Sequence, residues 1–233
     1  MLDLKVLGSS STGNCYLINT SKEVLILECG VHYKRIFEAL NYNLINVVGC
    51  LVTHEHADHS KSVNDLAKSG IEIYSSAGTL KALGVEGHRI HKVQSEKQFR
   101  AGNFIILPFE IQHDAAEPLG YLIYHPEFGK LLFATDTYYI KYKFNSLNYI
   151  MVECNYSKKL LDKNIHSGNL IPALRKRLLS SHFSLENVIK FLEANDLSAL
   201  KGIMLMHLSN SNSNANEFKE EIETVTGVPV TIC

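Results

Sequence analysis

The chain has 233 residues, of which 45% are hydrophobic and 20% are charged, so it is long enough to bury one sizeable core. Its formal net charge of −1 argues against a strongly basic protein that grips long nucleic acid. No long apolar segment or N-terminal hydrophobic region occurs, so neither secretion nor membrane spanning is indicated. Five scattered cysteines without C-x-x-C spacing are typical of free thiols in a reducing cytoplasm.

The first segments of the chain predict strands around a small polar loop. Apolar and polar residues alternate over 2–6, which indicates a half-buried strand. The glycine- and serine-rich stretch 8–14 follows, then a strand pair at 15–19 and 24–28 and a helix near 33–40. The loop either presents backbone N–H groups to a phosphate, with Ser11 and Asn14 as candidate substrate contacts, or is a plain hairpin turn.

The densest group of metal-ligand residues follows an apolar strand predicted at 47–52. Within six residues the chain has the spacing H-x-H-x-D-H, formed by His54, His56, Asp58 and His59. A helix is predicted to begin at Ser60, so rigid elements hold this loop on both sides. A surface histidine-rich turn is the alternative, and four ligand-type residues directly after a buried strand argue against it.

The spacing within this loop suggests two metal positions. His54 and His56 are two residues apart, so in an extended loop their side chains point the same way and can share one metal. Asp58 and His59 follow a bend of the chain and can serve a second metal beside the first.

The remainder of the chain mixes strands and helices. Further strands are predicted at 71–74, 104–109, 119–124, 130–135, 149–153, 203–206 and 228–232. Further helices are predicted at 77–83 and at 170–179. Another is predicted to begin after Ser184, which caps it, and a last one is predicted at 217–225, before Gly227. This order predicts an α/β protein with a single domain over residues 1–233, in which two mixed sheets are sandwiched between helices.

Four more candidates lie where regular elements end. His113, Asp136 and His207 each follow an apolar strand, and His182 follows a helix. Strand ends at one edge of a sandwich can assemble a site from segments far apart in the sequence. The other histidines lack this setting and are interpreted as surface or structural residues: His32, His88, His91, His125 and His166.

The stretch Thr53-His54-Glu55-His56-Ala57-Asp58-His59 resembles the signature of the metallo-β-lactamase-fold hydrolases, whose fold is an αββα sandwich. The resemblance implies two metal ions. One would be held by His54, His56 and His113, and the other by Asp58, His59 and His207, with Asp136 bridging them. Nitrogen and carboxylate ligands of this kind suit Zn²⁺, with Mn²⁺ as the main competitor.

Further segments resemble the YycJ-like and RNase Z-like branch of this fold over most of the chain. They are Leu7-Gly8-Ser9-Ser10-Ser11-Thr12-Gly13-Asn14, Gln112-His113-Asp114-Ala115-Ala116-Glu117-Pro118, Phe133-Ala134-Thr135-Asp136-Thr137, Glu153-Cys154-Asn155 and Met206-His207-Leu208-Ser209. Two departures stand out, because Glu28 replaces an aspartate and Ser181-His182 replaces the usual Gly-His.

The chemistry implied by two metals is hydrolysis, because they lower the pKa of a shared water toward about 7. In the resembling families a carboxylate at the position of Asp136 is usual in phosphodiesterases and thioesterases. Cleavage of a phosphodiester leaves an alkoxide that needs a proton donor, and His182 is the candidate acid. The alternative is a histidine that merely lies near a helix cap. Asp58 is the other candidate catalytic residue.

Within that branch, the short chain, its slightly negative charge and the lack of a long glycine-rich arm resemble the phage anti-Pycsar phosphodiesterases. That resemblance implies hydrolysis of 3′,5′-cyclic mononucleotides, such as cyclic CMP and UMP and also cyclic AMP and GMP, to linear monophosphates. It further implies a homodimer that counteracts a cyclic-nucleotide antiviral defence in the cytoplasm, the host's if a phage encodes the chain. The alternatives are a YycJ-like nuclease on DNA or RNA and a non-catalytic protein that sequesters a nucleotide.

Overall fold

The computed structural model describes residues 2–168 and 172–233, which form two compact units. Unit 1 contains residues 1–110 and 115–128, and unit 2 contains residues 111–114 and 129–233. A single domain over 1–233 stays a prediction.

Unit 1 contains a mixed six-stranded sheet and an antiparallel ribbon. The sheet has the order β1-β2-β3-β4-β5-β6, with antiparallel pairs at β1–β2 and β2–β3 and parallel pairs from β3 onward. Its strands are β1 (Asp3–Gly8), β2 (Cys15–Asn19), β3 (Val24–Leu27), β4 (Val47–Leu51), β5 (Ile73–Ser76) and β6 (Ile90–Val93). The ribbon joins β7 (Phe99–Ala101), β8 (Phe104–Glu110) and β9 (Leu119–His125).

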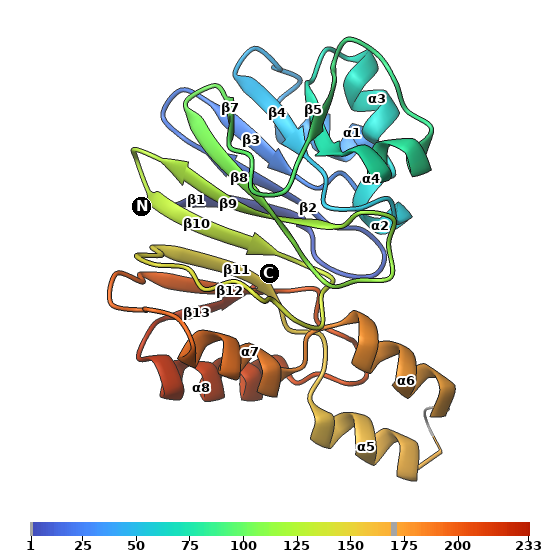
Figure 1. Cartoon of the computed structure of the whole chain (residues 1–233), viewed down its shortest axis with the longest axis vertical. Coiled ribbons are helices and arrows are strands. Elements are labelled where there is room, and N and C mark those ends of the chain that lie inside the picture. The colour runs from blue at the N-terminus through green and yellow to red at the C-terminus, as the bar shows by residue number, and fades with distance from the viewer. Residues whose placement is uncertain (1, 169–171) are drawn as a thin grey trace. The chain divides into compact units, whose positions relative to one another are not determined.

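Helices cover one face of the six-stranded sheet in unit 1. They are α1 (Tyr33–Ala39), α3 (Val63–Lys68) and α4 (Ala77–Leu83), which gather over β4 and β5 in Figure 1. Ile36, Leu66 and Leu80 supply their buried faces and join one apolar cluster with the strand residues Leu17 and Ile26. Burial of this apolar area is the main force that fixes the ends of β3 and β4 in place.

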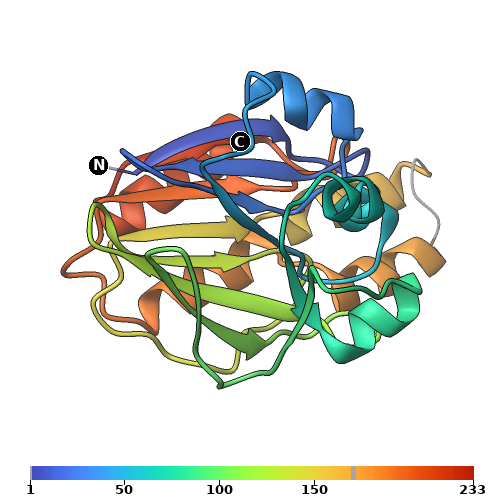
Figure 2. The ribbon, with the colours of Figure 1, turned by 90° about the horizontal axis from the view of Figure 1, so that it is seen from above.

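Unit 2 is built on parallel strands that run side by side in the order β13-β12-β11-β10 (Figure 2). They are β10 (Gly129–Ala134), β11 (Tyr149–Glu153), β12 (Gly202–Met206) and β13 (Val230–Ile232). All five residues of β11 are buried, as expected for a central strand of a parallel sheet. Because Ala134 pairs with Val152 and Val152 with Leu205, the carboxyl ends of β10, β11 and β12 lie level.

The helices of unit 2 are α5 (Lys158–His166), α6 (Pro172–Ser181), α7 (Leu185–Glu193) and α8 (Ala215–Thr226). The caps expected for two of them are confirmed. Ser184 accepts a hydrogen bond from the Asn187 N–H at the start of α7, and Gly227 ends α8 in a left-handed conformation. Helix α8 packs against α7 and against β13, the edge strand of the parallel group.

The structure differs from the sequence-based expectation at several elements. The helix expected from Ser60 is observed as α3, which begins later at Val63, and a separate helical turn, α2 (Ala57–Ser60), precedes it. The Ser60 hydroxyl bonds back to the Glu55 and His56 carbonyls instead of capping a new helix. Consequently Asp58 and His59 lie on a helical turn. The helix expected at 170–179 is observed as α6, and positions 170 and 171 lie outside the described residues. Helix α5 was not expected, and neither were β6 and β7, which are too short for a clear alternation.

The predicted fold class is confirmed, because the strands belong to two mixed β-sheets that helices flank. None of the helices in the described ranges has the length and apolar character that crossing a membrane requires.

Gly30 marks the tightest backbone approach at the end of β3. A Cβ atom on this residue would lie 1.7 Å from the Asp58 carbonyl oxygen, so only glycine fits there. We expect Gly30→Ala to lower the free energy of unfolding by about 3 kcal/mol or more, because backbone on both sides must move.

Gly84→Ala is the matched control, since Gly84 has φ +64° with no atom within 4 Å of an added Cβ. Its expected loss is about 1 kcal/mol, from the left-handed conformation alone. Urea unfolding of both variants measures the difference, and equal losses would contradict the steric argument.

Candidate metal centre

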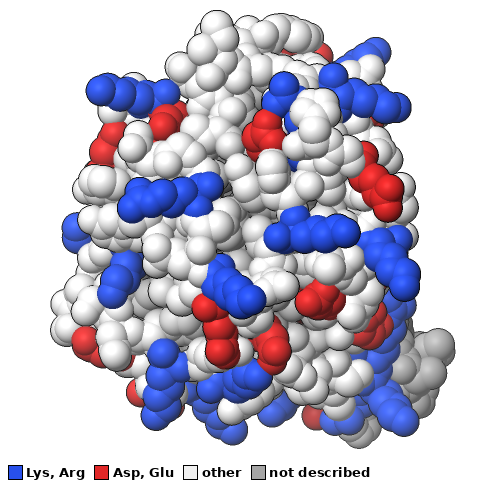
Figure 3. Space-filling model, turned by 45° about the horizontal axis from the view of Figure 1, so that its top comes forward, with Lys and Arg blue, Asp and Glu red and all other residues white. Residues whose placement is uncertain are grey.

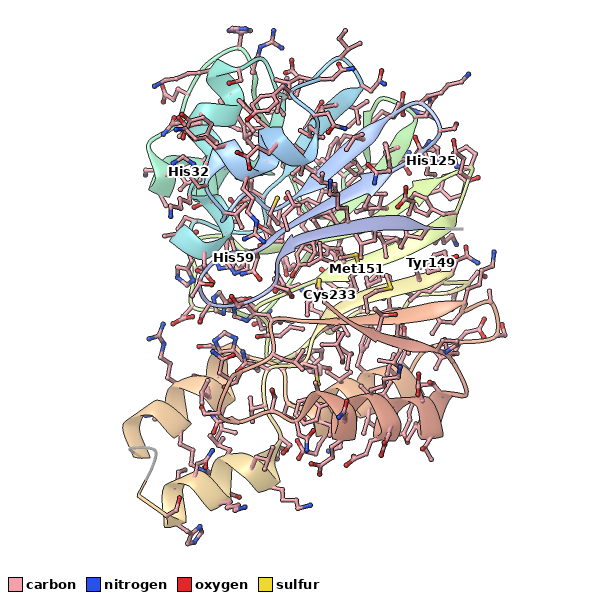
Figure 4. The ribbon with its side chains drawn as sticks, turned by 180° about the vertical axis from the view of Figure 1, so that it is seen from behind. His32, His59, His125, Tyr149, Met151 and Cys233 are labelled. Atoms are coloured by element: carbon pink, nitrogen blue, oxygen red, sulfur yellow. The ribbon has the colours of Figure 1, made fainter. Side chains whose placement is uncertain are left out.

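In unit 1 the four predicted ligands emerge directly from the end of β4. His54 and His59 are fully buried, and their ring centroids lie 4.2 Å apart. His54 Nε2 lies 3.1 Å from His56 Nδ1, and His59 Nε2 lies 3.3 Å from Asp58 Oδ2. Figure 4 places His59 at the opposite end of the strands of unit 1 from His125, in agreement with the structural role expected for His125. Nitrogen and carboxylate atoms therefore converge at one end of unit 1.

The loop between β1 and β2 holds this turn in place through Asn14. Its backbone N–H donates to the Asp58 carbonyl oxygen at 2.7 Å, and its fully buried side-chain amide contacts Asp58 Oδ2 at 3.4 Å and His59 Nε2 at 3.1 Å. Ser11, the other residue expected to contact substrate, is exposed in the same loop. Substrate contact by either residue stays a prediction.

A buried carboxylate stands behind His59. Glu28 Oε1 accepts a hydrogen bond from the Thr53 N–H at 3.2 Å, and Oε2 lies 3.6 Å from His59 Nδ1, slightly beyond hydrogen-bond distance. Burial raises the pKa of Glu28, and the opposing interaction with His59 is smaller. Carboxylates on the second nitrogen of a ligating histidine commonly fix its orientation, and Glu28 is positioned for that role.

In unit 2 the functional groups lie at the level carboxyl ends of three parallel strands. Asp136 follows β10, Glu153 ends β11 and His207 follows β12. His207 Nδ1 lies 3.5 Å from Asp136 Oδ1, and His113 Nε2 lies 3.8 Å from Asp136 Oδ2. The alignment of strand ends thus brings together Asp136, Glu153 and His207, which are far apart in the sequence, and His113 lies beside Asp136.

Glu153 is the centre of this group and is fully buried. Its Oε1 accepts from His182 Nδ1 at 2.5 Å and lies 3.2 Å from His207 Nδ1. Its Oε2 accepts the backbone N–H groups of Thr137 at 3.0 Å and Phe183 at 3.2 Å. One carboxylate therefore positions two histidines and two chain segments.

The pKa values in unit 2 reflect competition between burial and charge. Burial lowers the pKa of His182, but the charge of Glu153 and its hydrogen bond outweigh burial and leave the pKa raised. For Glu153 burial raises the pKa, but the attraction of His182 and the hydrogen bonds to the histidines outweigh it and leave the pKa lowered. Burial dominates at His113, whose pKa is lowered. His182 therefore holds its proton to higher pH than an ordinary histidine.

Three residues of these two groups have a strained backbone. Glu28, Asp136 and His207 have φ values of 62°, 45° and 53°, a left-handed region that costs a residue with a side chain about 1–3 kcal/mol. Each directly follows or lies close to the end of a strand, where the chain turns sharply. Strain of this kind concentrates at functional sites because the surrounding structure holds it in place.

The donor set fits a divalent metal. In unit 2, Asp136, Glu153, His182 and His207 each offer one ligand atom, and these atoms lie within 4.8 Å of one another. In unit 1 the close nitrogen and carboxylate atoms of His54, His56, Asp58 and His59 have the same chemistry. Imidazole nitrogen with carboxylate oxygen is the ligand combination of Zn²⁺ and Mn²⁺ sites.

Sequence reasoning found the histidines and aspartates but assigned no role to Glu28 or Glu153. The signal was present in both, because a glutamate ends an otherwise apolar strand in Leu25-Ile26-Leu27-Glu28 and in Tyr149-Ile150-Met151-Val152-Glu153. A carboxylate at the end of a fully buried strand must find polar partners or pay a large desolvation penalty.

The fold and these ligand groups define a metal-dependent hydrolase of the metallo-β-lactamase fold. The model of the β-lactamase superfamily domain matches residues 15–207, and the chain belongs to this family.

Known proteins that resemble the chain include nucleic-acid enzymes. Exodeoxyribonuclease YycJ of Bacillus anthracis is 29% identical over 230 residues, covering 91% of this chain and 84% of the relative. The metallo-β-lactamase fold protein YhfI of Bacillus subtilis superposes with a TM-score of 0.74 at 14% identity, covering 100% of this chain and 97% of that one. The short form of human tRNase Z superposes with a TM-score of 0.64 at 14% identity, covering 99% and 95%.

The charge of Glu153 is expected to raise the pKa of His182. We expect Glu153→Gln to lower the His182 pKa, because burial then acts without the opposing negative charge. The pair stabilises the fold most between the ordinary pKa values of glutamate and histidine, about pH 4.3 to 6.5. This contribution is lost as pH falls through the lowered Glu153 pKa or rises through the raised His182 pKa, and the variant should lack it.

NMR titration of the His182 ring in metal-free protein measures the pKa, and thermal unfolding against pH measures the stability. Glu193→Gln, an exposed change on α7, is the matched control. An unchanged His182 pKa in Glu153→Gln would disprove the coupling.

Proposed function

We propose that this chain is a dimetal phosphodiesterase that acts on nucleotides, with DNA ends as its first candidate substrate. The observation that carries the proposal is the similarity to exodeoxyribonuclease YycJ over 91% of the chain. The chemistry of the site supports it, because a histidine held by a buried glutamate beside metal-ligand residues suits proton donation to a departing sugar oxygen.

The proposed ligands are those that the family signature implies. One metal ion is assigned to His54, His56 and His113, and the second to Asp58, His59 and His207, with Asp136 as the bridge. Bound Zn²⁺ or Mn²⁺ would supply Lewis-acid polarisation of a phosphoryl oxygen and would acidify water. Glu28 and Glu153 act behind these residues by holding His59 and His207 in orientation.

His182 is the proposed general acid. Its Nδ1–H donates to Glu153 Oε1, so the proton available for transfer is at Nε2. As a water oxygen forms its bond to phosphorus and gives up a proton to bulk water, the bond from phosphorus to the sugar oxygen breaks, and that sugar oxygen takes the His182 Nε2 proton. Because its pKa is raised by Glu153, His182 holds its proton to higher pH than an ordinary histidine does.

A second feature of unit 2 favours a polyanionic strand. Helices α5 and α6 carry Lys158, Lys159, Lys163, Arg175, Lys176 and Arg177, against Asp162 as their one acidic residue. Arg175 pairs with Asp162 and Lys159 pairs with Glu217, and all of these cations except Arg175 are exposed. Clustered Lys and Arg are the usual electrostatic contact for phosphate backbones.

Hydrolysis of 3′,5′-cyclic mononucleotides to linear monophosphates, which would counteract a cyclic-nucleotide (Pycsar) defence, is the second candidate. The net charge of −1 favours it, because a small ligand needs no extended basic surface. On the face drawn in Figure 3, lysines and arginines are interspersed with acidic side chains. A cytoplasmic location is part of the proposal for either substrate, and the free thiols of Cys15, Cys50 and Cys154 are consistent with a reducing compartment. The homodimer also remains a proposal, which sedimentation analysis over a range of concentrations would test.

The substrate class is tested with Mn²⁺- or Zn²⁺-loaded protein, single-stranded and duplex oligonucleotides, and a panel of cyclic mononucleotides, with EDTA controls. We expect EDTA-sensitive shortening of DNA, and a loss of at least about 100-fold in Asp58→Ala and His59→Ala with circular dichroism unchanged. Asp65→Ala, an exposed change on α3, is the matched control.

Conversion of cyclic mononucleotides to linear monophosphates, with the oligonucleotides left intact, would select cyclic-nucleotide hydrolysis instead. Turnover of neither class, or wild-type turnover in Asp58→Ala, would refute the proposed phosphodiesterase.

The acid role of His182 predicts a dependence on the leaving group. His182→Ala should slow cleavage of an ordinary phosphodiester by about 10²–10⁴-fold, and should slow a p-nitrophenyl ester far less, because that leaving group needs no proton. Kinetics with both substrates measure the difference, with the exposed His88→Ala as control. Equal losses on the two substrates would rule out the acid role.

A further inference from the structure

A pocket of about 230 Å³ lies in unit 2 beside the segment that follows Asp136. One wall is the stretch 139–143, and the other is the face of α7 that carries Asn187, Lys190 and Phe191. Tyr139 is 56% exposed, whereas Phe191 is 7% exposed. The pocket therefore has an accessible aromatic rim over an apolar floor.

Hydrogen bonds connect this pocket to the buried Glu153. The Thr137 and Phe183 N–H groups that donate to Glu153 Oε2 belong to the two segments that continue into the pocket walls. The Thr137 hydroxyl donates to the Tyr139 carbonyl oxygen at 2.9 Å, and Asn187 Nδ2 donates to the Tyr138 carbonyl oxygen at 3.5 Å. The carboxylate that positions His182 thus also positions the pocket beside it.

The lining combines aromatic rings with ammonium groups. Tyr139, Tyr142, Phe183 and Phe191 supply the rings, and Lys141, Lys143 and Lys190 supply the charges. Lys141 Nζ lies 5.1 Å from the centre of the Tyr142 ring. Within the described part of the chain no carboxylate lines the pocket. An occupant with a flat ring and negative charge fits this chemistry, whereas a purely apolar or a cationic one does not.

We propose that this pocket binds an unpaired nucleotide of single-stranded DNA, next to the phosphodiester that is cleaved. The base stacks on Tyr139, and Lys143 and Lys190 contact the flanking phosphates. Single-stranded DNA is the proposed occupant because stacking needs an exposed base face, which a duplex conceals. The inference rests on the proposed function for its place in the reaction, but binding itself needs no turnover.

Binding is therefore measured in EDTA, by fluorescence anisotropy of a labelled oligothymidylate with the full chain. Tyr139→Ala should weaken binding about tenfold, since one stacked base is lost, and Tyr139→Phe should restore it. Tyr124→Ala, on β9 of unit 1, is the matched control because Tyr124 is 40% exposed. An abasic oligomer should bind wild type and Tyr139→Ala alike.

The lysines are tested by the salt dependence of the same binding. Exchange of both Lys143 and Lys190 for glutamine should reduce the slope of log affinity against log salt by about 1.4, or about 0.7 for each lost phosphate contact. Lys68→Gln with Lys81→Gln, both in unit 1, is the matched pair.

Wild-type oligomer affinity and salt slope in these variants would overturn the inference. The binding of thymidine monophosphate is measured with the same variants. If the variants lose this binding while their oligomer binding is unchanged, the assignment to a strand is overturned and the pocket binds a mononucleotide. If the wild type cleaves no nucleotide and yet the variants lose oligomer binding, the proposed function fails and the pocket stands.

Discussion

Unit 2 depends above all on the buried carboxylate of Glu153. A charge without solvent contact is stable only when its partners replace water, and here both oxygens are satisfied. One oxygen faces the His182 and His207 rings, and the other accepts two backbone N–H groups. The same residue therefore raises the pKa of a histidine, orients a proposed metal ligand and holds the two segments that form the walls of a pocket. An apolar residue here could preserve the strand but not this arrangement.

The sites in both units use one structural device, which is a polar side chain at the end of a buried parallel strand. The strands are held by apolar packing, and the chain then turns through left-handed conformations at Glu28, Asp136 and His207. Such turns are unfavourable for residues with a side chain, so the packed strands must stabilise them. In return the carboxylate and imidazole atoms are rigidly placed, which lowers the cost of organising them around a charged ligand.

Family membership accounts for the type of reaction, whereas the surfaces around the ligands bear on the choice of substrate. The match over residues 15–207 and the ligand groups account for metal-dependent hydrolysis, which the family carries out on many substrates. The choice of substrate depends on surfaces outside the ligands. In unit 2 those surfaces are the exposed cations of α5 and α6 and the aromatic pocket beside α7, and both suit an unpaired nucleic-acid strand.

The sequence by itself determined the fold class, and it predicted the metal ligands from H-x-H-x-D-H after an apolar strand, a local pattern that chance rarely produces. It also located the caps at Ser184 and Gly227, whose effects act within a few residues. Only the tertiary structure decided the roles of Glu28 and Glu153, and the pocket between 139–143 and α7. Their partners lie tens of positions away, and strand register, which packing sets, brings them together.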